Sequence, residues 1–269
     1  MAEAPPAPRL AGLVRGYTGF VERSMVPLRR REVPSPTAVM IVNFGAPLEV
    51  EAPGVRAESH PGSFLARVSE LPATTEFTGT SAGVQVDFTA IGAHLFCGLA
   101  MSDLPAPSVG LEELLGEEGR LLTDELEDAP GWEARFDLLD AAIERRVAAA
   151  REPTPSIEWA WRALEASAGT VSIARLTERI GCSPGHLIDG FRAHVGVAPK
   201  TAARVVRFDR ASRALRRSRP APLARLAAEC GYHDQAHMTR EFRALAGTTP
   251  AAYAGAWLPG YLGVAADAG

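Results

Sequence analysis

The side chains most able to bind a charged partner are basic, and they are unevenly spread along the 269 residues. Residues 1–153 hold 13 Arg against 23 Asp and Glu, whereas residues 154–258 hold 15 Lys and Arg against 8 Asp and Glu. Phosphate groups of nucleic acid are a common partner of such a positive region. The net charge of −4 therefore conceals a C-terminal segment suited to phosphate contacts, with an ordinary solvated helical surface as the alternative.

Residue types that serve catalysis or metal binding lack the spacing that those functions need. His60 and His94 occur without an H-x-H pair and without a carboxylate at i+4. Cys97 follows an apolar run and has no basic neighbour that would activate its thiol. Nucleotide-binding and nucleophile-elbow motifs are absent from the sequence. We expect no enzyme activity, no metal and no cofactor.

The cysteines indicate a reducing compartment. Cys97, Cys182 and Cys230 are scattered and show no CxxC spacing, which is typical of reduced thiols. Residues 1–20 lack the continuous apolar core of a signal peptide. Apolar runs also stay well below the roughly 18 residues of a membrane span. We expect a cytoplasmic protein that does not bind a membrane.

A pair of short helices must position part of the basic segment. Residues 223–250 predict two helices joined by a tight turn, with Gly231 ending the first and Asp234 capping the second. The second helix repeats its apolar residues at helical spacing. These residues are Met238, Phe242 and Leu245. The pattern predicts a helix-turn-helix unit.

The same unit occurs about 50 residues earlier. Ile173-Ala174-Arg175-Leu176 matches Leu223-Ala224-Arg225-Leu226 at an offset of 50, and Phe191-Arg192-Ala193 matches Phe242-Arg243-Ala244 at an offset of 51. The second turn is therefore one residue longer. Residues 199–217 predict one long helix between the units, spanning roughly 28 Å. That length would place the units about one turn of B-DNA apart.

The N-terminal half is predicted to be rich in strands. Residues 38–42 form an apolar β-branched run, and residues 84–89 alternate strictly between apolar and polar types. Gly and Pro clusters separate such runs, which favours an antiparallel sandwich or small barrel. Residues 132–151 predict an amphipathic helix that either packs on this sheet or mediates dimerisation.

Residues 156–257 resemble the DNA-binding domain of AraC/XylS-family transcriptional regulators. The matching stretches are ARLTERIGCSPGHLIDGFRAHVGVAPK, VVRFDRASRAL and LARLAAECGYHDQAHMTREFRALAGTTPAAY. The resemblance implies a sequence-specific transcription regulator that reads double-stranded DNA with the second helix of each unit. It implies an N-terminal domain that senses a small-molecule effector or forms a homodimer, and RNA polymerase as a further partner.

The expected fold class is α+β, with a cupin-like sandwich or barrel and packed helices followed by an all-α domain of two helix-turn-helix units. Five segments are predicted along the chain. They are a disordered N-terminus (1–15), a sensing or dimerisation domain (16–152), a linker (153–156), the DNA-binding domain (157–258) and a flexible tail (259–269).

The resemblance assigns DNA contacts residue by residue. In the second recognition helix the contacts are Gln235, Ala236, His237, Thr239 and Arg240. In the first they are Ser183, Gly185, His186, Asp189 and Arg192, with phosphate contacts at Lys200, Arg204 and Arg243. Arg can read guanine and Gln can read adenine, each with about 1–3 kcal/mol of discrimination.

The first recognition helix departs from the family pattern. A carboxylate, Asp189, stands where relatives often carry a basic or large polar residue, and Gly185 replaces a larger side chain. Gly190 should weaken the helix by roughly 1 kcal/mol. We expect the first unit to add little base discrimination.

Other function classes remain open at this point. The N-terminal half could be a ligand-free scaffold of a constitutive DNA-binding or protein-interaction protein. A sizeable apolar cavity with converging polar groups would favour effector sensing. A filled sandwich with an exposed apolar patch would favour the scaffold. An interaction adaptor that does not bind DNA is the third alternative.

Overall fold

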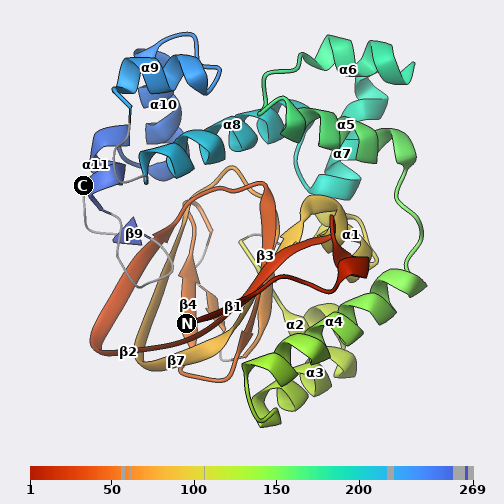
Figure 1. Cartoon of the computed structure of the whole chain (residues 1–269), viewed down its shortest axis with the longest axis vertical. Helices are drawn as coiled ribbons and strands as arrows, with labels where there is room; N and C mark the ends of the chain where they lie inside the picture. The colour runs from red at the N-terminus through yellow and green to blue at the C-terminus, as the bar shows by residue number, and fades with distance from the viewer. Residues whose placement is uncertain (56–57, 61, 106, 217–220, 257–263, 266–269) are drawn as a thin grey trace.

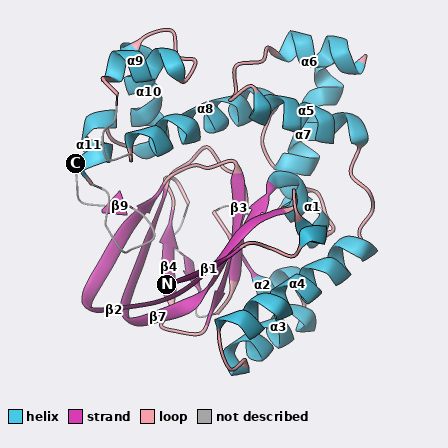
Figure 2. Ribbon diagram, in the orientation of Figure 1, coloured by secondary structure: helices cyan, strands magenta, loops and turns pink. Residues whose placement is uncertain are grey.

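The computed structural model describes the chain except for residues 56–57, 61, 106, 217–220, 257–263 and 266–269. A strand-rich N-terminal region precedes a helical C-terminal region (Figures 1 and 2), so the expected α+β class is confirmed. Figure 1 shows α8 lying across one end of the sheet, while α3 and α4 lie at another side of it. No helix within the described ranges is long and apolar enough to cross a membrane.

The described strands form one antiparallel sheet. Its main path runs β1-β2-β7-β3-β6-β8, with β4 on β7, β5 on β4 and β9 on β2. The strands are β1 (Ala2–Ala4), β2 (Val14–Glu32), β3 (Thr37–Asn43), β4 (Leu48–Glu51), β5 (Glu58–His60), β6 (Phe64–Ala66), β7 (Ala73–Thr89), β8 (Val109–Gly110) and β9 (Val264–Ala265). The long β2 and β7 pair through most of their length, with a register shift between Ser24 and Leu28 that marks a bulge.

The strict alternation at residues 84–89 is explained by the two faces of β7. Val84, Val86 and Phe88 are fully buried in the main core. Gln85 and Asp87 point to the opposite face of the sheet, because successive strand residues alternate sides. The polar face therefore lines a cavity.

Four α-helices of the N-terminal region cover the core face of the sheet. They are α1 (Ala90–Cys97), α2 (Leu111–Leu115), α3 (Glu117–Asp128) and α4 (Trp132–Ala149). The 3-10 turn η1 (Pro8–Leu10) lies between β1 and β2, and η2 (Met101–Asp103) follows α1. In α4, Phe136, Leu139 and Ile143 belong to the same core as Met40 of β3. The apolar face of α4 thus packs on its own domain, which agrees with the first of the two expectations for residues 132–151.

The N-terminus differs from the expected disorder over residues 1–15. β1 pairs with β2, Leu10 and Val14 are buried, and the Ala7 amide donates to Asp140 Oδ1 at 3.0 Å. These apolar side chains fill space between the sheet and α4, which Pro- and Ala-rich composition does not reveal. Of the expected tail 259–269, only β9 is described; the remaining residues lie outside the described ranges.

The C-terminal region contains the predicted pair of helix-turn-helix units. Its helices are α5 (Pro155–Ala166), α6 (Ile173–Ile180), α7 (Pro184–Val195), α8 (Pro199–Leu215), α9 (Leu223–Glu229), α10 (Gln235–Ala246) and α11 (Pro250–Gly255). Gly181 and Gly231 have φ of 74° and 77°, which is the left-handed conformation. Gly181 ends α6, and Gly231 lies in the turn between α9 and α10. The predicted cap is also confirmed, since the Asp234 carboxylate accepts from the His237 amide at 2.7 Å.

The observed bounds of α5 and α8 differ from those expected from the sequence. Pro155 opens α5 rather than standing in a linker, because proline is tolerated at the first position of a helix. The long helix α8 has 17 residues, so it spans roughly 25 Å. Its buried residues Val205, Phe208 and Ala211 follow one another at helical spacing and so share one face.

The first helix-turn-helix unit shares an apolar core with the N-terminal region. Ile91 and Leu95 of α1 join Trp161 of α5, Phe191 of α7 and Val206 of α8 in one buried cluster. The second unit has its own core around Phe208, Phe242 and Tyr253. Residues of α5, α6 and α7 therefore pack against the N-terminal region through this apolar cluster. The expected domain boundaries remain predictions.

Candidate DNA interface and interdomain cavity

The outer face of α10 presents several of the expected DNA-reading residues. Gln235, Ala236, Arg240 and Arg243 are exposed. The opposite face of α10 carries Met238, Phe242 and Leu245, which are buried in the core of the second unit. Burial of that face on α8 leaves the polar face directed outward.

Two other expected contacts on α10 are partly occupied within the protein. The His237 ring stands edge-on to Tyr232 at 5.4 Å, and its Nε2 lies 3.9 Å from Glu241 Oε1. Thr239 Oγ1 donates to the Gln235 carbonyl at 2.9 Å. Gln235 and Arg240 are the better placed pair for base contacts, and the assignment remains a prediction.

The first recognition helix α7 exposes Gly185, His186, Asp189 and Arg192. Ser183 is the N-cap of this helix, since its hydroxyl accepts from the His186 amide at 3.2 Å.

Gly190 has a packing role that the sequence did not reveal. A Cβ atom at this position would lie 2.4 Å from Cδ1 of Ile157 in α5. The lack of a side chain lets α5 approach α7 closely, so the lower helix propensity of glycine accompanies a tight helix contact. Nothing local to residues 184–195 marks that requirement.

The expected phosphate contacts divide into two groups. Lys200 and Arg243 are exposed on α8 and α10. Arg204 instead donates through Nη1 to Glu70 at 2.9 Å and through Nε to Glu241 at 3.0 Å. Arg204 is thus engaged by two carboxylates in this conformation, and a phosphate contact would have to replace one of them.

Glu241 is a buried acidic residue of α10 that no motif in the sequence marks. It is 8% exposed, and its Oε1 lies 3.5 Å from Arg207 Nη2 as well as within hydrogen-bond distance of Arg204. The Arg207 guanidinium also lies over the Tyr232 ring, 5.2 Å from its centroid. Two arginines of α8 therefore hold the recognition helix through one carboxylate.

A cavity of about 940 Å³ lies between the sheet and the C-terminal helices. Its apolar part includes Phe20, Ile41, Val50 and Phe64, which form a small cluster on the sheet face opposite the main core. Its remaining wall includes charged residues of both regions. These are Glu3, Arg15, Glu22, Arg30, Arg31, Glu32, Arg67, Asp87, Asp209, Arg213 and Arg216.

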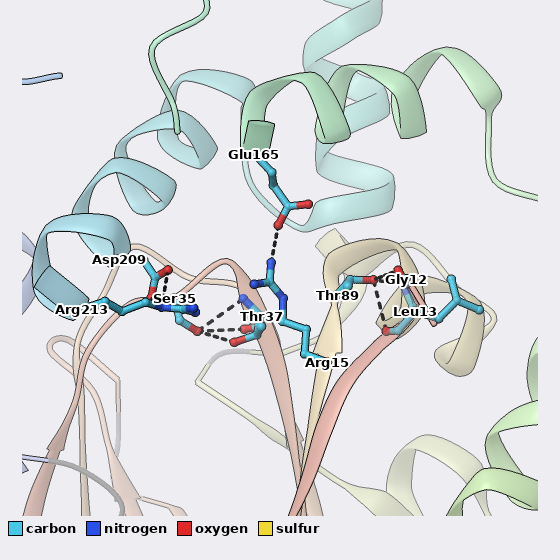
Figure 3. A network of polar contacts seen from close by, with 10 residues as sticks. Gly12, Leu13, Arg15, Ser35, Thr37, Thr89, Glu165, Asp209 and Arg213 are labelled. Carbon is cyan, nitrogen blue, oxygen red and sulfur yellow. Dashed lines mark hydrogen bonds and ion pairs between the residues drawn. The ribbon is translucent and has the colours of Figure 1, made fainter. Parts of the chain in front are cut away.

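The cavity residues Arg15 and Arg213 form ion pairs where the sheet meets the helices (Figure 3). Arg15 of β2 pairs with Glu165 of α5, and Arg213 pairs with Asp209 within α8, at 2.9 Å. Burial raises the pKa of Asp87, while its hydrogen bond from Gln85 and the nearby Arg15 and Arg213 act in the opposite direction.

A second group of charges lies on β2 next to the β7 residues 73–77. Arg30 and Glu22 form a buried pair at 2.9 Å, and Arg30 lies over the Phe77 ring. Glu32 accepts from Thr75 Oγ1 at 2.9 Å, and burial raises the pKa of its carboxyl. No motif in the sequence marks these residues, and the alternation at Gln85 and Asp87 was its only signal of a polar inner face.

Comparisons with known proteins agree with this architecture. A family model described as a helix-turn-helix domain matches residues 176–256. No curated protein matches the sequence. ToxT from Vibrio cholerae has a similar fold: one solved structure is 7% identical, with a TM-score of 0.53 over 90% of this chain and 98% of that one. An apo structure of a ToxT variant from the same organism is 9% identical, with a TM-score of 0.53 over 88% and 96%.

A third ToxT structure is bound to (E)-4-(8-methylnaphthalen-1-yl)but-3-enoic acid; it is 7% identical, with a TM-score of 0.52 over 90% of this chain and 98% of that one. Identities this low establish a common fold only. The paired units and the family match define the class of the protein, a DNA-binding transcription regulator. Residues 176–256 match a model of the AraC type of helix-turn-helix domain.

Proposed function

We propose that this chain is a sequence-specific transcription regulator whose DNA binding is controlled by a small molecule bound between its two regions. The observation that carries the effector proposal is the cavity of about 940 Å³, whose wall is shared by the sheet and α8. A ligand there would touch Asp209 and Arg213 of the DNA-binding domain directly. Such a ligand could change the energy of docking one region on the other.

The cavity favours a ligand with an apolar body and one polar end. Phe20, Ile41 and Phe64 offer apolar contacts. Arg15 and Arg213 bring guanidinium donors to the cavity, where a ligand would compete with their partners Glu165 and Asp209. A carboxylate would suit those donors. The naphthalenyl-butenoic acid in a ToxT structure has this chemistry, which supports an amphipathic acid as the class to test first.

A ligand-free scaffold is the competing function for the N-terminal region. It would require a filled interior, whereas this sheet face borders open volume. The cavity therefore favours effector sensing over a purely structural role.

The effector proposal is tested on the full chain by thermal unfolding with aromatic and aliphatic acids of graded length. An acid present at about 100 times its Kd should stabilise the protein by about 2.7 kcal/mol. Ile41→Trp should reduce that stabilisation, because the indole occupies the apolar part of the cavity. If no acid changes either the unfolding temperature or the DNA affinity, the ligand-free scaffold is favoured.

The assignment of α10 as the principal reader is tested by mapping binding sites across a genome. Arg240→Ala should lose preference at one base position, at a cost of about 1–3 kcal/mol for the best site. Arg243→Ala is the matched control, since loss of a phosphate contact should weaken all sites similarly and lower the salt slope by about 1. Unchanged occupancy and motif in Arg240→Ala would refute the reader assignment.

A further inference from the structure

The segment 67–72, between β6 and β7, borders the cavity on one side. Arg67, Ser69 and Leu71 all line the cavity. The Leu71 amide donates to Ser69 Oγ at 3.0 Å, and Pro72 follows with its restricted backbone. A ligand in the cavity would therefore meet three side chains of one short segment.

The same segment contacts the first recognition helix. Arg67 Nη1 donates to the Gly196 carbonyl at 3.2 Å, and Gly196 is the left-handed residue that ends α7. Val68 is 1% exposed and belongs to the apolar cluster that contains Phe191 of α7. Movement of residues 67 and 68 would thus displace the C-terminal end of α7.

Glu70 connects the segment to the second recognition helix. Its carboxylate pairs with Arg204 of α8, whose Nε donates to Glu241 of α10. Glu241 directly precedes the buried Phe242 and follows Arg240 in sequence. A single guanidinium therefore joins the N-terminal region to the helix that carries the expected base contacts.

We propose that residues 67–72 couple the cavity to both recognition helices, through Arg67 and Val68 to α7 and through Glu70 and Arg204 to α10. This inference rests on the proposed function, because it assigns the route by which the same cavity controls DNA binding. Energetic coupling is reciprocal. DNA bound to α7 and α10 must therefore alter the segment even when no effector is present.

Hydrogen exchange in the full chain tests that reciprocity. Exchange of amides 67–71 is measured in the free protein and with saturating duplex that the wild-type protein has selected from random-sequence DNA. The wild type should show a change in exchange of at least about fivefold. Glu70→Gln should reduce that change, and Glu70→Gln combined with Arg67→Met should bring it within about twofold. Glu76→Gln, which removes a carboxylate paired with Arg29 on the sheet, should leave it as in the wild type.

Unchanged exchange of amides 67–71 in the DNA-bound wild type would overturn the proposal. A change as large as that of the wild type in the double variant would also overturn the proposal. If the double variant does not fold, a change of that size in Glu70→Gln alone would overturn it. Thermal unfolding of each variant reports whether it is folded. A DNA-induced change that is present while every acid fails in the ligand assay would refute effector control and leave the link between the segment and the readers standing.

Discussion

At the scale of single residues, Asp87 links the chemistry of the cavity to stability. Burial raises the pKa of this carboxyl in the folded protein. The folded state then holds its proton at pH values where the unfolded chain has lost it, so stability decreases as pH rises from about 3.9 through the folded pKa. Loss of this proton in the folded protein is consequently destabilising.

Asp87→Asn should therefore be more stable than the wild type at pH 7, because the amide keeps an oxygen that accepts from Gln85 without burying a charge. The gain should shrink as the pH falls toward about 4. Urea unfolding midpoints of both proteins at pH 4.5, 5.5 and 7 measure the effect. An equal gain at all three pH values would show that the ionisation of Asp87 is not its cause.

At the scale of elements, close approach of α5 and α7 depends on Gly190. Gly190→Ala should destabilise the protein by about 1–3 kcal/mol, because the added methyl group would overlap Ile157. Gly185→Ala in the same helix is the control: its nearest neighbour would be Ser183 Oγ at 3.9 Å, so alanine should be neutral or stabilising by up to about 1 kcal/mol. Chemical unfolding of both variants makes the comparison, and equal midpoints would contradict the packing role.

At the scale of the whole molecule, the shared apolar core predicts that the N-terminal region and the first helix-turn-helix unit unfold together. Ile91 of α1 lies in the cluster that contains Trp161 and Phe191. Ile91→Ala should cost about 2–5 kcal/mol and should increase hydrogen exchange in α5 and α7. Ile143→Ala is the matched truncation in the core beneath α4, where the added exchange should stay in the N-terminal region. Equal protection of α5 and α7 in both variants would show that the two regions are energetically independent.

The sequence by itself determined the paired helix-turn-helix units, because their signals are local. Gly231 stops a helix and the Asp234 carboxylate caps the next one, three residues apart. Buried positions such as Phe242 repeat with the 3.6-residue period of a helix, which is visible in the sequence. The α+β class followed from the change between that period and the two-residue period of the strands.

Only the tertiary structure decided how the two regions meet. Alternation at Asp87 predicted a strand with two unlike faces, yet long-range pairing determined that its polar face borders an interdomain cavity. Arg204 belonged by sequence to a basic helix surface, whereas Glu70, 134 residues away, and Glu241 engage it. Such contacts depend on the relative placement of distant segments, and composition and periodicity report only on near neighbours in the chain.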